Sequence, residues 1–156
     1  MATSELWGAL GTETVLISNT AFSALANNAL VVSADYNNVQ AGGGGGGDVL
    51  CRLRFICSMA VAAAANTGFS VWFLKSSDGG TTWEAGGTAY TPLRLPDCVF
   101  PAPVDTTQRE ISRDILCPAG HWKLLVKNDG TSQSTKTDTT SAGSQISVIP
   151  FTRQSV

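Results

Sequence analysis

The clearest pattern in the chain is a strict alternation of apolar and polar side chains over residues 48–65. The alternating sets are Val49, Cys51, Leu53, Phe55, Cys57, Met59 and Val61 on one face, and Arg52, Arg54, Ser58 and Ala60 on the other. A side-chain period of two is that of a β-strand with one buried face. A helix here would turn Arg52 and Arg54 toward the core. The segment therefore predicts a strand, and residues 62–65 either continue it or curl into a turn.

Shorter segments of the same kind occur along the chain and are separated by turn residues. Strands are predicted over 12–18, 25–33, 69–76, 81–83, 108–117, 121–128 and 145–152. Residues 18–22 have the composition of a turn or a half-buried connection. Tight turns need glycine where φ is positive, and they are predicted at Asp78-Gly79-Gly80, Pro118-Ala119-Gly120 and Asn128-Asp129-Gly130.

Prolines interrupt the long connection before residue 108, at Pro92, Pro96, Pro101 and Pro103. Proline is excluded from central strands because it has no backbone N–H to donate. We therefore expect this connection to cross between two sheets or to run along a sheet edge.

Short strands at this density, with no helical pattern and no internal repeat, are typical of a β-sandwich or barrel. We predict an all-β fold, a single jelly-roll-like β-sandwich of about eight strands spanning residues 12–156. Residues 1–11 are small and polar and are expected to form an extended N-terminal arm, with Leu6 and Trp7 as isolated apolar anchors. A chain of 156 residues is long enough to bury a core without metal or disulfide bonds.

A run of six glycines occupies residues 42–47 and is followed by Asp48. A phosphate-binding loop would continue with a lysine and a serine or threonine, and neither follows here. We interpret the run as a flexible loop tip between strands.

Charged residues are scarce: they make up 14% of the chain, with 10 Lys and Arg against 12 Asp and Glu. No basic run marks a nucleic-acid site, and none is expected. Either uncharged polar side chains solvate the surface, or partners cover much of it, since interface cores are depleted in charge. No secretory signal and no membrane-spanning run are recognisable, so we expect synthesis in a cytoplasm and no membrane association.

The four cysteines are expected to be free thiols. Cys51 and Cys57 lie about 20 Å apart along one strand, at roughly 3.3 Å per residue, and cannot bond to each other. Cys98 or Cys117 could pair with either of them. No Cys-x-x-Cys spacing occurs and His121 is the only histidine, so neither a metal site nor a cofactor is expected.

Residues 76–83 fit the Asp-box pattern Ser-x-Asp-x-Gly-x-Thr-Trp. In sialidases and related propellers this motif locks a hairpin by hydrogen bonds from side chains to the backbone. One copy in a chain too short for a six-bladed propeller predicts a structural role. The residues of this predicted lock are Ser76, Asp78, Gly80, Thr82 and Trp83.

Catalytic constellations are not recognisable. A glycosidase needs two facing carboxylates, but the glutamates Glu5, Glu13, Glu84 and Glu110 are scattered along the sequence. A hydrolytic triad would need His121 as its base, yet that residue is predicted within a strand and no Gly-x-Ser-x-Gly elbow exists. We therefore predict that the protein is not an enzyme.

Tryptophans could line a sugar-binding platform, but more often they pack in cores or against hairpins. Trp122 alternates with Lys123 as a core residue does. Trp72 falls on the face opposite Phe69, Val71 and Phe73, so its side chain is expected to face solvent or a partner.

From Phe69 onward, the order of turn and strand signals resembles the capsid decoration (cement) proteins of tailed bacteriophages. The matching motifs are Ser76-Ser77-Asp78-Gly79 with Trp83, Gly86-Gly87, Gln108-Arg109, Pro118-Ala119-Gly120, Trp122-Lys123 and Asn128-Asp129-Gly130. These motifs specify turns rather than active-site chemistry. The six-glycine run and the cysteines depart from the family pattern.

The resemblance implies a jelly-roll protein, commonly a homotrimer, on the exterior of a phage capsid. It would bind the major capsid protein at capsomer junctions and stabilise the shell, with Leu6, Trp7 and Trp72 as candidate interface residues. The alternative is a receptor- or glycan-binding β-sandwich module of a tail fibre.

Overall fold

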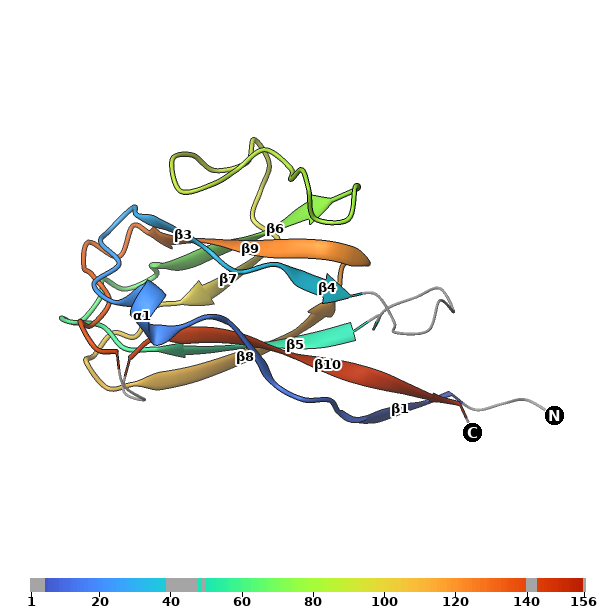
Figure 1. Cartoon of the computed structure of the whole chain (residues 1–156). Helices are drawn as coiled ribbons and strands as arrows, with labels where there is room; N and C mark the ends of the chain where they lie inside the picture. Colours follow the sequence, from blue (N-terminus) through green and yellow to red (C-terminus); the bar gives the residue numbers. More distant parts are fainter. Residues whose placement is uncertain (1–4, 39–47, 49, 140–142, 156) are drawn as a thin grey trace.

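The computed structural model describes residues 5–38, 48, 50–139 and 143–155, and Figure 1 shows that they are almost entirely β. The elements are β1 (Glu5–Leu10), β2 (Thr14–Ile17), α1 (Asn19–Phe22), β3 (Leu30–Val32), β4 (Tyr36–Asn38), β5 (Leu50–Cys57), β6 (Gly68–Ser76), β7 (Cys98–Pro101), β8 (Arg109–Leu116), β9 (Gly120–Asp129) and β10 (Gln145–Ser155). The six-glycine run lies outside the described residues. No helix in the described part of the chain is long and apolar enough to span a membrane.

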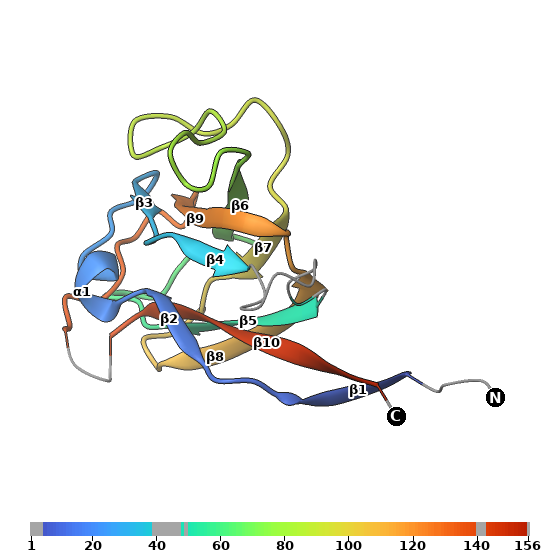
Figure 2. The ribbon, with the colours of Figure 1, turned by 45° about the vertical axis from the view of Figure 1, so that its right-hand side comes forward.

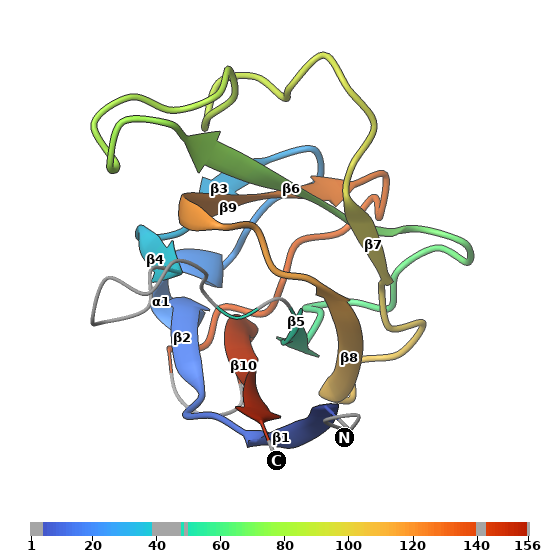
Figure 3. The same ribbon diagram turned by 90° about the vertical axis from the view of Figure 1, so that its right-hand side faces the viewer.

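The strands form two antiparallel sheets that face each other (Figure 3). One has the order β1-β10-β5-β8, with β2 also on β10, and the other the order β3-β9-β6-β7, with β4 also on β9. If β1 with β2 and β3 with β4 are each taken as one interrupted strand, the chain changes sheet at every connection except that from β6 to β7. This is the connectivity of an eight-stranded jelly roll. The predicted all-β, jelly-roll-like sandwich is confirmed.

The core lies between the sheets and is built on the alternation predicted for β5. Cys51, Leu53, Phe55 and Cys57 are all fully buried. The Phe55 ring lies at the centre, with the centroids of Phe69 and Phe100 at 5.0 and 5.3 Å. Burying several large side chains in one cluster supplies most of the hydrophobic stabilisation of such a domain.

The strand predicted over 48–65 ends at Cys57 rather than continuing. The Ser58 N–H bonds to the Ser144 hydroxyl, at 2.9 Å, instead of extending a ladder. Met59 is still buried, through a single bridge to Thr135. Val61 was predicted on the buried face, but its side chain is 54% exposed.

Two further predicted segments differ from the structure. Residues 18–22 contain the short helix α1, whose first turn is capped by the Ser18 hydroxyl accepting from the Ala21 N–H. The strand predicted over 25–33 is shortened to Leu30–Val32. Ala24 and Asn28 adopt positive φ angles of 54° and 63°, which interrupt an extended backbone.

The proline-rich connection both follows an edge and crosses between sheets. Its strand β7 pairs with β6 at the sheet edge, and its proline, Pro101, is the last residue of that strand. The chain then passes to β8 in the opposite sheet.

The extended segment predicted at the N-terminus is strand β1 from Glu5 onward. It pairs with the last part of β10, from Phe151 to Ser155. The β5 partner of β10 pairs only as far as Pro150. Figures 1 and 2 show the resulting two-stranded ribbon projecting from the sandwich.

The outer face of the β3-β9-β6-β7 sheet is covered by the segment 77–97, which arches over it (Figures 1 and 3). Beneath this segment lies a second apolar cluster of Trp72, Leu74 and Leu125. Trp72 is therefore only 5% exposed. The expectation that its side chain faces solvent or a partner is wrong, because the chain's own loop covers it.

Candidate functional site

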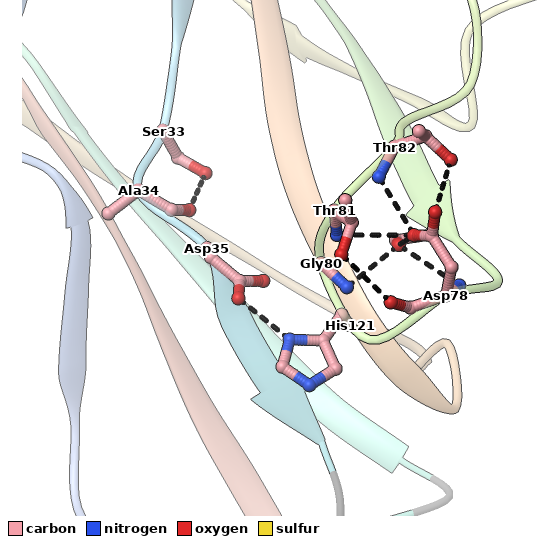
Figure 4. A network of polar contacts seen from close by, with 9 residues as sticks. Ser33, Ala34, Asp35, Asp78, Gly80, Thr81, Thr82 and His121 are labelled. Carbon is pink, nitrogen blue, oxygen red and sulfur yellow. Dashed lines mark hydrogen bonds and ion pairs between the residues drawn. The ribbon is translucent and has the colours of Figure 1, made fainter.

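The Asp-box turn follows the end of β6 and is held by the Asp78 carboxylate (Figure 4). Asp78 Oδ1 accepts the backbone N–H groups of Thr81 and Thr82 at 3.1 and 2.8 Å. Asp78 Oδ2 accepts the Thr82 hydroxyl at 2.7 Å, and the Ser76 hydroxyl accepts the Gly80 N–H at 2.9 Å. The Thr82 backbone N–H, followed by the hydroxyls of Thr82 and Ser76, lowers the pKa of Asp78 to about 2.

The chain after this turn does not return as the strand predicted over 81–83. The turn's bonds to Thr81 and Thr82 wrap this stretch around the Asp78 carboxylate instead. One backbone bond, from the Glu84 N–H to the Lys75 carbonyl at 3.0 Å, ties the stretch to β6. Trp83 is half-buried, and the Lys123 ammonium lies 4.0 Å from the centre of its ring, a cation–π contact.

His121 lies beside the same turn and pairs with Asp35, which immediately precedes β4 (Figure 4). Its Nδ1 is 2.7 Å from Asp35 Oδ2. A side chain at Gly80 would meet both groups, because a Cβ there would lie 3.1 Å from Nδ1 and 3.2 Å from Oδ2. In the described residues no hydroxyl or thiol hydrogen-bonds to the ring, so the pair lacks the nucleophile of a triad. The pair links the start of β4 to β9 directly beside the turn.

Two glutamates that are scattered in the sequence meet on one arginine. Arg54 bonds to Glu13 at 2.9 Å and to Glu110 at 2.7 Å on the outer face of the β1-β10-β5-β8 sheet. The hydrogen bond from Ser147, and then that from Arg54, lowers the pKa of Glu13, and Arg54 lowers the pKa of Glu110. A general acid needs the opposite shift, so neither carboxyl has the raised pKa of a general acid.

The four cysteines are free thiols. Cys51 and Cys117, two of the partners that the sequence left open, are neighbours, and the hydrogen bond between them together with burial raises the pKa of Cys51. Burial raises the pKa of Cys57 to about 12 and that of Cys98 to about 11. Protonated thiols are poor nucleophiles and poor metal ligands. The described residues contain no cluster of three or more potential metal ligands.

The segment 84–97 presents two leucines at the surface: Leu93 and Leu95 are 108% and 86% exposed. We call these two residues the leucine tip. Arg94 between them is 37% exposed, but its guanidinium bonds back to the Phe73 carbonyl, Asp97 and Glu84. Nothing in the sequence pattern marked this tip, because the prolines around it indicated only an irregular connection.

Shallow grooves lie elsewhere on the surface. A groove of about 630 Å³ on β6 and β7 is lined by polar groups that include Ser70, Arg113 and Asp129, with no aromatic ring among its described lining. Another, of about 510 Å³, runs beside the Asp-box turn and is lined by Lys75, Trp83 and Glu84 among others.

The candidate interface residues are not gathered in one place. Leu6 and Trp7 lie in β1, where their backbones pair with Gln154 and Arg153 of β10. Trp72 is buried beneath the segment 77–97 on the opposite sheet.

Comparisons with known proteins identify no relative of this chain by sequence. No family model matches, and no curated protein matches. Among solved structures, a family 35 carbohydrate binding module from an environmental isolate is similar, with a TM-score of 0.44 and 11% identity, covering 100% of this chain and 98% of that chain. At this identity and TM-score the likeness carries no inference about function.

Proposed function

We propose that this protein is a non-enzymatic structural protein of a phage virion, a capsid decoration protein that binds the outside of the major capsid shell and stabilises capsomer junctions. It would be made in the host cytoplasm, assemble as a homotrimer and remain on the capsid exterior. The order of motifs from Phe69 onward supports this assignment.

The observation that carries the proposal is the ribbon formed by β1 and the end of β10. Within the described residues, β10 beyond Pro150 pairs with β1 alone. A two-stranded ribbon is at best marginally stable in water, and both of its outer edges offer free backbone groups. A neighbouring protein that packs on this ribbon or adds a strand would stabilise it. Such a contact suits a protein that works by attachment to an assembly.

The chemistry of the described side chains also favours a non-catalytic role. Hydrogen bonds from Ser147 and then Arg54 lower the pKa of Glu13, and Arg54 lowers that of Glu110, while burial raises the pKa values of Cys57 and Cys98. The Asp35–His121 pair has no nucleophile bonded to it among these residues. Many copies on one shell would combine modest contacts into tight attachment.

The test is cosedimentation of the purified protein with expanded capsids of the same phage. We expect saturable binding and a capsid that releases its DNA at a higher temperature. A variant lacking residues 5–10 should keep the sandwich but bind more weakly. If the intact protein does not attach to the capsids, the proposal is wrong.

A glycan-binding module of a tail fibre is the second candidate. The groove beside the Asp-box turn favours it, because the Trp83 ring lines this groove next to the polar groups of Lys75 and Glu84. Ligand-observed NMR with host glycans on the same protein sample separates the two functions. Glycan binding that is lost in Trp83→Ala, without capsid binding, would favour the second candidate.

A further inference from the structure

The leucine tip is the most exposed apolar feature of the described surface. Leu93 and Leu95 are 108% and 86% exposed, and Tyr90 in the same segment is 58% exposed. Single apolar side chains at a surface are normal, whereas contiguous apolar patches mark interaction sites. Leu93 and Leu95 lie two residues apart on one protruding segment. Figures 1 and 3 show the segment standing above the sandwich.

Arg94 fixes the direction of the two leucines. Its guanidinium donates to the Phe73 carbonyl at 2.7 Å, to Asp97 at 2.7 Å and to Glu84 at 3.3 Å. The Arg94 carbonyl accepts the Trp72 indole N–H at 3.1 Å. This residue is bound through both its side chain and its backbone, while the leucines on either side of it point into solvent.

Two further residues, Asp97 and Gly86, hold the segment against the protein body. Asp97 donates its N–H to the Val71 carbonyl at 2.8 Å and accepts the Phe73 N–H at 2.7 Å. Gly86 packs against the sheet so closely that a Cβ there would lie 2.9 Å from Leu74 and 3.1 Å from Pro92. A surface held in its binding conformation loses little entropy when it docks, which strengthens binding.

The charges around the tip indicate the chemistry of its partner. Arg94 is paired with both Glu84 and Asp97 within the segment, so no positive charge is left unpaired there and the two acids against one base give residues 84–97 a net charge of −1. An anionic lipid surface would call for free basic side chains, and residues 84–97 contain no Lys or Arg besides Arg94. The surface complementary to the two leucines is an apolar pocket, without acidic groups that would repel Glu84 and Asp97.

The small size of the tip limits which kinds of partner it can bind. Two leucines and a tyrosine cannot supply the roughly 1,000 Å² of buried surface that a stable pairwise interface needs. They suit one contact among several on a repeating surface, where many copies bind together. We infer that the leucine tip inserts into an apolar pocket on the outer surface of the capsid shell protein. This inference rests on the proposed function and adds a second attachment point, remote from the ribbon.

The experiment compares the affinities of full-length variants for expanded capsids. We expect the double variant Leu93→Ser/Leu95→Ser to bind at least about tenfold more weakly, the effect of losing one hot spot of about 1.4 kcal/mol or more. The matched control is Val61→Ser/Val104→Ser, which removes two apolar side chains that are 54% and 65% exposed on other loops. It should bind within about twofold of the original protein.

The possible results distinguish a failure of the leucine-tip inference from a failure of the proposed function. Capsid binding by the original protein that the leucine variant retains in full would overturn the inference and leave the proposed function standing. No capsid binding by the original protein would overturn both. Sedimentation velocity and binding to anionic vesicles complete the test. If the leucine variant loses self-association, the partner of the tip is a second copy of this chain. If vesicle binding depends on the tip, its partner is a lipid surface. Either result would overturn the inferred pocket on the shell protein.

Discussion

At the residue scale, Gly68 shows how closely the strands of one sheet approach each other. It is the first residue of β6 and lies opposite Pro101 of β7 and Asp129 of β9. A Cβ at this position would overlap the Phe100 carbonyl oxygen and lie 3.2 Å from the Pro101 Cα. Because both of these are backbone atoms, they cannot move aside without disturbing the ladder.

Gly68→Ala is therefore expected to destabilise the protein by about 2–3 kcal/mol, the upper part of the range for overpacking. For a domain of this size the melting temperature would fall by roughly 4–12 °C. Gly87→Ala is the matched control, since a Cβ there meets nothing within 4 Å, and it should change the melting temperature little. Equal melting temperatures of the two variants would contradict the steric argument.

At the element scale, the free edge of β6 is closed by side chains instead of a strand. β7 pairs with β6 only as far as Val71. The next peptide groups along that edge, the N–H and carbonyl of Phe73, are bound by Asp97 and Arg94. The segment 84–97 thus acts as an edge cover, which native sheets need to avoid unwanted pairing.

Removing this cover should loosen the segment before the sandwich unfolds. Arg94→Ala deletes a charge-assisted bond to a carbonyl, with an expected cost of about 1–2 kcal/mol after allowance for partial exposure. Cleavage by chymotrypsin after Tyr90 and Leu93 should be roughly 5–30 times faster. The control is Arg109→Ala, whose ion pair with Asp105 at 2.6 Å is exposed and joins no backbone group. Unchanged cleavage of Arg94→Ala would show that the segment is held by other contacts.

At the scale of the whole molecule, folding depends on ionised carboxylates. Hydrogen bonds from partner groups lower the pKa values of Glu13, Asp78, Asp105, Glu110, Asp114 and Asp129. Burial raises the pKa of Asp48, with the opposite effect. A lowered native pKa gives stability that is present above the unfolded value, about 4, and is lost as the pH falls through the native value.

The urea midpoint is accordingly expected to fall between pH 5 and pH 2. For Asp78 the loss extends from about pH 4 to its native pKa of about 2. Asp78→Asn should lower the midpoint at pH 6 and reduce its further drop below pH 4. A midpoint that rises or stays constant on acidification would contradict this account.

The sequence pattern correctly predicted the parts of the fold that are determined by neighbouring residues. The alternation in β5 and the Asp-box turn both depend on residues that are close in the sequence. Tertiary bonds decided the rest: Ser144 ends the strand at Cys57, and Arg94 with Asp97 holds the cover over Trp72. The continuous apolar run 71–74 did indicate a strand buried on both faces, which is consistent with the burial of Trp72.

The candidate site was predictable to a similar extent. The hydrogen bonds of the turn lie on Ser76, Asp78, Gly80 and Thr82, which the motif singled out. The leucine tip and the meeting of Glu13 with Glu110 were not predictable, because both depend on how distant segments are placed. The pattern of apolar and polar residues along the chain does not show which distant segments come together.

The register of the ribbon brings Glu5 directly opposite Ser155. A linker of a few residues could join these two positions and give a circular permutant with new ends in a surface loop. In Figures 1 and 2 the ribbon lies at the opposite side of the molecule from the segment that carries the leucine tip. An enzyme or epitope fused beside Ser155 would therefore lie away from Leu93 and Leu95 but directly beside the proposed ribbon contact.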